Sequence, residues 1–286
     1  ARELLTESGS IFVQISDENL HHVREVMDEV FGGENCVSLV LFKKTGFFSS
    51  DGIAVTHDFL LWYAKNIQTA KLMRVYGDRE LTSDELRFHD YVETLSGTRR
   101  PLTKEEKESG PAVRDLGKPY ARNPLVSDGW QETLGFEFEF EGKGFRPPGN
   151  CHWKTHFDGM CRLKDQGRLA IKGNTLRYVR FFDDFPVQPL GSVWNDTGVG
   201  GFVGDQRLYV VQTDTRVLQR CMLMTTDPGD LVFDPTCGSG TTAYVAEQWG
   251  RRWITCDTSR VPLALARQRL LTATFPWYEL KEPARG

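Results

Sequence analysis

Over the first 70 residues, apolar positions fall either in short continuous runs or at helical spacing. Residues 1–8 are predicted to be the end of a helix that stops at Gly9, and residues 10–16 a buried strand. Residues 17–31 carry apolar side chains at helical spacing before two glycines, which predicts an amphipathic helix. Residues 37–42 and 59–63 are predicted strands joined by a Gly/Ser-rich loop at 45–51. Because this α/β alternation is already under way at the first residue, we expect the chain to be cut at its front.

The pattern changes in the middle of the chain and returns near its end. Residues 84–115 are charged and expected to be helical in part, residues 136–142 alternate like a short strand, and residues 169–182 predict a hairpin turning at Gly173 and Asn174. From residue 213 onward we expect helices at 213–226, 241–249 and 261–271, strands at 231–234 and 252–256, and a final strand at 275–280. The middle block is therefore interpreted as an insertion in one α/β core.

Composition places the chain among globular proteins and excludes several classes. Hydrophobic residues make up 40% and charged residues 26%, and no apolar run is long enough to cross a bilayer. The six cysteines form no CxxC pair, which favours reduced thiols in the cytoplasm over disulfides or a zinc site. The net charge of −4 argues against a nucleic-acid partner, but residues 142–180 hold nine Lys or Arg against two acids. That block is either a solvated basic surface or a phosphate-binding face.

A glycine loop between a strand and a helix carries the strongest chemical signal. Residues 231–243 read LVFDPTCGSGTTA, so the strand runs into Gly238 and Gly240 and a helix begins at once. Glycines let the backbone turn sharply near a ligand, and a helix amino terminus presents free N–H groups. Asp257 ends the next strand, where its carboxylate could accept hydrogen bonds from two ribose hydroxyls. Helix capping is the structural alternative for Asp257.

Spacing alone leaves two nucleotide classes open at this loop. The sequence also fits a dinucleotide fingerprint, so an NAD-dependent oxidoreductase remains an alternative. A phosphate-binding P-loop is excluded because no Lys follows Gly240. A carboxylate at Asp234 would repel a pyrophosphate and suits the ammonium group of S-adenosylmethionine.

DPTCGSGTT at 234–242 resembles the cofactor motif of the permuted-order, beta-type DNA amino-methyltransferases. RELLTESGSIFVQISDEN (2–19) and THDFLLWYAKN (56–66) resemble core segments of that family in the right order. CHWKTHFDGMCRLKDQGRL (151–169) and GSVWNDT (191–197) resemble landmarks of the adenine-specific modification subunits of type III restriction-modification systems. Thr236-Cys237 stands where the family has Phe-Ala, Asp257 where it has Glu, and Gln212-Thr213-Asp214 where it has Lys-Pro.

The resemblance implies a Rossmann-like, mostly parallel S-adenosylmethionine-dependent methyltransferase sheet with an inserted mixed α+β target-recognition region. Residues 1–69 and 198–286 would form the core, and residues 70–197 the recognition region. The family's catalytic Asp/Asn/Ser-Pro-Pro-aromatic motif occurs nowhere in the chain, so no catalytic residue is assigned and the chain alone is expected to be inactive. The parent would methylate N6 of adenine in duplex DNA after base flipping, with N4 of cytosine as the close variant. A DNA-recognition module with a vestigial cofactor loop is a further alternative.

The resemblance also selects candidate binding residues and partners. The cofactor S-adenosylmethionine is assigned to Asp234, Pro235, Thr236, Cys237, Gly238, Ser239, Gly240, Thr241, Thr242 and Asp257. Duplex DNA is assigned to Trp153, Lys154, Arg162, Lys164 and Arg168, with possible partners in a restriction subunit and a second modification subunit. Cys237 is interpreted as a packing residue and His57 as structural. His152 and His156 lie four apart, but no third ligand stands nearby, so no metal site is assigned.

Overall fold

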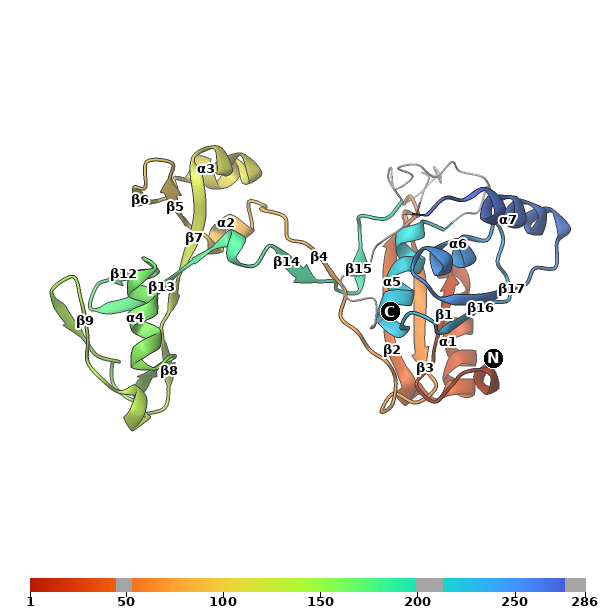
Figure 1. Cartoon of the computed structure of the whole chain (residues 1–286), viewed down its shortest axis with the longest axis horizontal. Coiled ribbons are helices and arrows are strands. Elements are labelled where there is room, and N and C mark those ends of the chain that lie inside the picture. The colour runs from red at the N-terminus through yellow and green to blue at the C-terminus, as the bar shows by residue number, and fades with distance from the viewer. Residues whose placement is uncertain (45–52, 199–212, 276–286) are drawn as a thin grey trace. The chain divides into compact units, whose positions relative to one another are not determined.

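The computed structural model describes residues 1–44, 53–198 and 213–275, and these fall into two compact units (Figure 1). The first unit holds residues 1–76 together with the segment from residue 189 onward, and the second holds residues 77–188. The chain passes between the units through β4 (Tyr76–Asp78) and β14 (Val187–Pro189), which pair with each other. The loop expected at 45–51 and nearly all of the strand expected at 275–280 lie outside the described residues.

A four-stranded sheet forms the larger part of the first unit. Its order is β1 (Ser10–Ile15), β3 (His57–Ala64), β2 (Cys36–Lys43) and β15 (Val193–Trp194). β15 runs parallel to β2, while β3 is antiparallel to both β1 and β2. The sequence predicted a mostly parallel sheet, and this sheet is mixed instead. β3 runs opposite to its two neighbours, β1 and β2, which are parallel to each other.

Helices cover both faces of this sheet. α1 (Asp17–Phe31) packs Met27 and Phe31 against Leu61 and Tyr63 on one face. α5 (Thr215–Thr225) packs on the other face, where Leu60 and Trp62 lie. Burial on both faces explains why β3 is a continuous apolar run rather than an alternating one.

A parallel two-stranded sheet, β16 (Leu231–Asp234) and β17 (Arg252–Thr255), completes the first unit with α6 (Thr241–Gln248) and α7 (Arg260–Thr272). Val232 and Trp253 pack on one face against Val245 and Ala246 of α6 and Met222 of α5. The other face leaves Leu231, Phe233 and Ile254 about half exposed. The predicted strand–loop–helix–strand order from 231 to 256 is confirmed.

The amino terminus differs from expectation. Residues 1–8 contain only the short 3₁₀ turn η1 (Arg2–Leu4), and a second such turn, η2 (Gly33–Asn35), follows α1. The expected end of a helix is wrong because Leu5 already has an extended backbone.

The second unit is built on the five-stranded antiparallel sheet β12-β13-β7-β5-β6. Its strands are β12 (Leu169–Lys172), β13 (Thr175–Phe181), β7 (Gly117–Pro124), β5 (Tyr91–Thr94) and β6 (Arg99–Pro101). The hairpin predicted at Gly173 and Asn174 is confirmed, since Lys172 pairs with Thr175 across that turn.

Short elements surround this sheet. They are α2 (Glu85–Phe88), α3 (Lys104–Glu108), η3 (Gly110–Asp115), η4 (Glu132–Leu134), α4 (Phe157–Asp165), η5 (Phe182–Asp184) and the paired strands β8 (Val126–Asp128) with β11 (Cys151–Trp153) and β9 (Phe138–Phe140) with β10 (Lys143–Phe145). No described helix is long and apolar enough to span a membrane.

Candidate cofactor loop and basic surface

The glycine loop follows the pattern that its sequence predicts. β16 ends at Asp234, residues 235–240 form the loop, and α6 starts directly after Gly240. Gly238 and Gly240 have φ of +51° and +75°, a region that favours glycine. A Cβ on Gly238 would meet no heavy atom within 4 Å, so the backbone there borders open space. A ligand can therefore approach the main chain at Gly238.

Gly240 has a different surrounding. A Cβ on it would lie 2.7 Å from the Cβ of Ala266 in α7. This glycine lets α7 pack closely against the loop, which is a reason for its presence that needs no ligand.

Asp234 holds the loop to the start of α6. One carboxylate oxygen accepts a hydrogen bond of 3.0 Å from the Thr236 amide, and the other accepts one from the Thr242 hydroxyl. The half-buried carboxylate thus sits at the strand end where the sequence placed it. Its oxygens keep unused lone pairs for a cationic ligand group.

Asp257 ties the two strand ends together. It follows β17 after Cys256 and accepts 2.9 Å hydrogen bonds from the amides of Ser259 and Gly238. These bonds, the Ser259 amide first, lower the pKa of Asp257, so the group is held as a carboxylate. It both shapes the turn into α7 and faces the glycine loop, and each oxygen retains acceptor capacity for a hydroxyl.

The other loop residues divide by burial. Pro235 and Thr236 are exposed, whereas the side chains of Cys237, Ser239 and Thr241 are 4–6% exposed. Thr241 accepts a hydrogen bond from Arg269, and burial raises the pKa of the Cys237 thiol. Cys237 is a packing residue, as predicted. Because the side chains of all three residues are buried, these residues can contact a ligand only through their backbone atoms.

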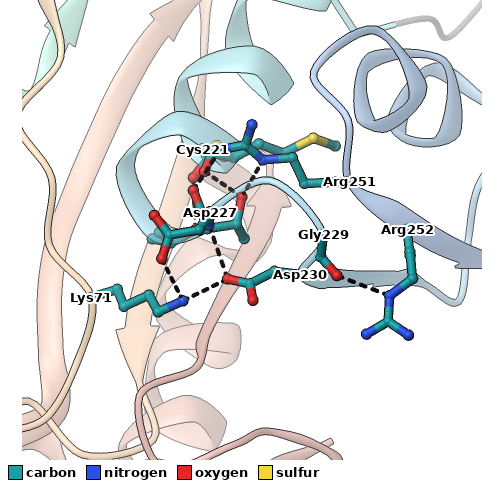
Figure 2. A network of polar contacts seen from close by, with 10 residues as sticks. Lys71, Cys221, Asp227, Gly229, Asp230, Arg251 and Arg252 are labelled. Carbon is teal, nitrogen blue, oxygen red and sulfur yellow. Dashed lines mark hydrogen bonds and ion pairs between the residues drawn. The ribbon is translucent and has the colours of Figure 1, made fainter. Parts of the chain in front are cut away.

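A polar network supports the turn that leads into β16 (Figure 2). Lys71 forms ion pairs of 2.8 Å with Asp227 and 2.6 Å with Asp230. Arg251 donates to the carbonyl oxygens of Thr226 and Trp249, both at 2.6 Å. The strand that carries Asp234 is thereby anchored to the end of α5.

The residues assigned to DNA do not form one surface. Lys154, Arg162 and Lys164 are exposed. Arg168 stacks over Phe181 and forms an ion pair with Asp184, so its charge is compensated.

The expectation for Trp153 needs a correction. Its side chain is 1% exposed in the core of the second unit, and its indole N–H donates to the Phe136 carbonyl. A side chain enclosed in this way has no surface for DNA. The sequence alone did not mark this burial, because the pairing of Trp153 with Val126 becomes visible only in the fold.

His57 lies at the start of β3, where Nδ1 is 2.7 Å from the Thr56 hydroxyl and Nε2 is 3.4 Å from the Asn195 side-chain oxygen. These contacts join β3 to the segment after β15. They fit the structural role that the sequence favoured.

Comparison with known proteins places this sequence among DNA methylases. A sequence model of the N6/N4 methyltransferase family, described as DNA methylase, matches residues 1–268 of this chain. The type II methyltransferase M.EcaI of Enterobacter cloacae is 24% identical over 290 residues, which cover 96% of this chain and 56% of the relative. The "probable type III restriction-modification enzyme HindVI Mod subunit" of Haemophilus influenzae is 24% identical over 320 residues, covering 94% and 42%. The chain therefore spans about half the length of these relatives.

Among solved structures, the M1.HpyAVI–SAM complex aligns with a TM-score of 0.40 and 10% identity, covering 94% of this chain and 77% of that one.

Proposed function

We propose that this chain, which belongs to the DNA methylase family, is the cofactor-binding and DNA-binding part of a methyltransferase that acts on N6 of adenine in duplex DNA. The observation that carries the proposal is the glycine loop held between Asp234 and Asp257. The cofactor of the family is S-adenosylmethionine, which supplies the transferable methyl group on its sulfonium when bound.

The residues of the loop fit this cofactor better than a dinucleotide. The Asp234 carboxylate suits an ammonium group and disfavours a pyrophosphate. The open backbone at Gly238 permits close approach, and Asp257 offers a charged acceptor to ribose hydroxyls. Asp234, Gly238 and Asp257 would therefore hold the cofactor, with the amides at the start of α6 beside it.

Transfer to DNA requires groups that this sequence does not supply. The exocyclic amine of adenine is a weak nucleophile because its lone pair is delocalised into the ring. In the beta-type DNA amino-methyltransferases that this sequence resembles, an Asp/Asn side chain and a prolyl carbonyl accept hydrogen bonds from this amine. An aromatic ring stacks on the flipped base. The chain contains no such motif, so we propose that it does not methylate DNA alone.

The choice of adenine is supported by the resemblance of residues 151–169 and 191–197 to adenine-specific modification subunits. N4 of cytosine is the second candidate, because the family covers both amino groups. Lys154, Arg162 and Lys164 are proposed to contact DNA from the second unit, where all three are exposed. Restriction and modification subunits are proposed as protein partners, in line with the Mod relatives.

The test is methyl transfer from labelled S-adenosylmethionine to mixed-sequence duplex DNA, followed by hydrolysis to nucleosides. A protein that joins this chain to an Asp/Asn/Ser-Pro-Pro-aromatic motif should yield N6-methyladenine, and this chain should yield no labelled base. N4-methylcytosine would replace the adenine assignment, and transfer by this chain alone would show that the acceptor site lies within it.

A further inference from the structure

The two faces of the five-stranded sheet in the second unit differ in the hydrophobic clusters that the described residues form on them. The hydrophobic clusters of this unit use Val92, Leu176 and Leu169, which share one face. α4 packs on that face through Met160, and η3 through Val113. The strand pairing puts Tyr91, Tyr120, Arg122, Arg177, Val179 and Phe181 on the other face, where Tyr120 and Val179 are buried and the two arginines are half-buried.

Arg122 and Arg177 are diagonal neighbours on this second face. Arg122 pairs with Val179 and Arg177 with Pro124, so the two arginines lie two residues apart across β7 and β13. Long side chains at such positions reach each other. Burial is the main cause that lowers the pKa of Arg122, and the charge of Arg177 lowers it further against the opposing effect of Asp90. Two like charges are thus held together on a half-buried surface.

Neither arginine has a carboxylate partner among the described residues. Arg122 stacks on the Tyr91 ring at 3.7 Å and donates to its hydroxyl, and Arg177 makes no hydrogen bond or ion pair in the described part of the chain. The Nε atoms of both are buried without an acceptor. An unpaired buried donor on a charged group is costly, and an anion bound beside the two guanidinium groups would compensate their charge.

Two other arginines beside this face are compensated by carboxylates, whereas Arg180 on the opposite face shares with the pair a buried Nε that has no acceptor among the described residues. Arg99 is bound to Glu93 at 2.6 Å, and Arg168 to Asp184 at 2.8 Å. Both also lie over the Phe181 ring. The protein therefore neutralises the guanidinium groups at one side of the face and leaves the Arg122–Arg177 pair open.

We propose that the Arg122–Arg177 pair binds a backbone phosphate of duplex DNA. A guanidinium fork matches phosphate oxygens with two parallel N–H donors, and an extended sheet face suits a polymer. This inference rests on the proposed function, because it takes DNA as the substrate, and it places a contact outside the lysine and arginine positions that the sequence selected.

The test compares the full chain with the double variant Arg122→Gln/Arg177→Gln in fluorescence-anisotropy titrations of duplex DNA at several salt concentrations. The variant should bind about tenfold more weakly, and the slope of log K against log salt should be shallower by about 0.9, the value for one lost phosphate contact. The loss should be equal for two duplexes of unrelated sequence, because phosphate contacts carry no base information.

The matched control is Lys118→Gln/Lys172→Gln, which removes two exposed charges from the same sheet face. It should stay within about twofold of the wild type. An equal effect in both variants, or no effect in the arginine variant, overturns the proposal. If circular dichroism shows that the arginine double variant does not fold, the single variant Arg177→Gln is used, since that side chain has no described partner to lose. Weaker duplex binding with a shallower salt slope in this variant supports the proposal. Wild-type affinity and salt slope overturn it.

Cofactor titrations of the same samples separate this proposal from the proposed function. Wild-type chain that binds S-adenosylmethionine but no duplex overturns the phosphate site and leaves the cofactor site standing. Wild-type chain that binds neither overturns both. Binding of inorganic phosphate at constant ionic strength, with no duplex binding, would assign the pair to a free anion and overturn the DNA contact.

Discussion

At the scale of single residues, the structure gives Asp257 and Gly240 roles that the sequence left open. Ribose binding and helix capping were alternatives for Asp257, and the carboxylate both orders the Ser259 turn and holds the Gly238 amide. Gly240 lies in the loop predicted to approach the ligand, and its missing Cβ also makes room for Ala266. Sequence spacing identified the loop correctly, because local backbone rules determine it. Contacts with α7 could not be predicted, since they depend on tertiary packing.

Replacing Asp257 by Ala should weaken S-adenosylmethionine binding at least tenfold, because a charged acceptor for the ribose hydroxyls is removed. Isothermal titration calorimetry measures the change. Asp165→Ala, an exposed aspartate at the end of α4, is the control and should bind like the wild type. Unchanged affinity in a folded Asp257→Ala protein would remove the ribose role.

Gly240→Ala should lower stability by about 1–3 kcal/mol, because the new Cβ overlaps Ala266 in a packed region at positive φ. Gly250→Ala is the matched control, as its φ of +70° is similar and its Cβ would meet nothing within 4 Å. Denaturant unfolding of both variants gives the comparison. Equal losses would mean that backbone strain alone, without the Ala266 contact, accounts for the effect.

At the scale of elements, prediction succeeded where a local pattern and the final packing agree. The helix at 17–31 and the strand at 231–234 have the predicted bounds, and the Gly173–Asn174 turn connects the predicted hairpin. Residues 84–115 were expected to be partly helical, yet they also contain β5 and β6. These strands have three or four residues and carry charges such as Glu93 and Arg99 that pair across them, so their alternation is too short to detect. β7 is longer, but its sequence GKPYARNP contains two prolines and no regular apolar alternation, which hid this strand and its Arg122.

The α3 capping box provides a test of local electrostatics. Glu106 accepts from the Thr103 amide and pairs with Arg100 at 2.7 Å, and these contacts, Arg100 first, lower its pKa from 4.5 to about 2. A lowered pKa in the folded state contributes stability above pH 4.5 that is lost as the pH falls toward 2. Glu106→Gln should therefore cost about 1 kcal/mol at pH 7 and progressively less below pH 4.5.

Thermal melting of wild type and Glu106→Gln across this pH range measures the difference. The control is Glu108→Gln. Glu108 is a more exposed acid at the end of α3, and its replacement should show no such pH dependence. A gap between wild type and Glu106→Gln that stays constant with pH would contradict the role of the ion pair.

At the scale of the whole molecule, the sequence motifs identified the family and the order of the core segments, and the family model confirms that identification over residues 1–268. The α/β class is confirmed as well. The burial of Trp153 and the neighbouring positions of Arg122 and Arg177 could not be predicted from the basic block, because charge counts do not say which side of a sheet a residue faces. Membership in the DNA methylase family supports a methyltransferase and does not by itself choose between adenine and cytosine.

The central claim is that the loop from Asp234 to Thr242 binds S-adenosylmethionine, and calorimetric titration of the chain with this cofactor and with NAD tests it most directly. The account predicts saturable one-site binding of S-adenosylmethionine and no heat of binding for NAD, because Asp234 disfavours a pyrophosphate. Binding of NAD, or of neither ligand by a folded chain, would contradict it.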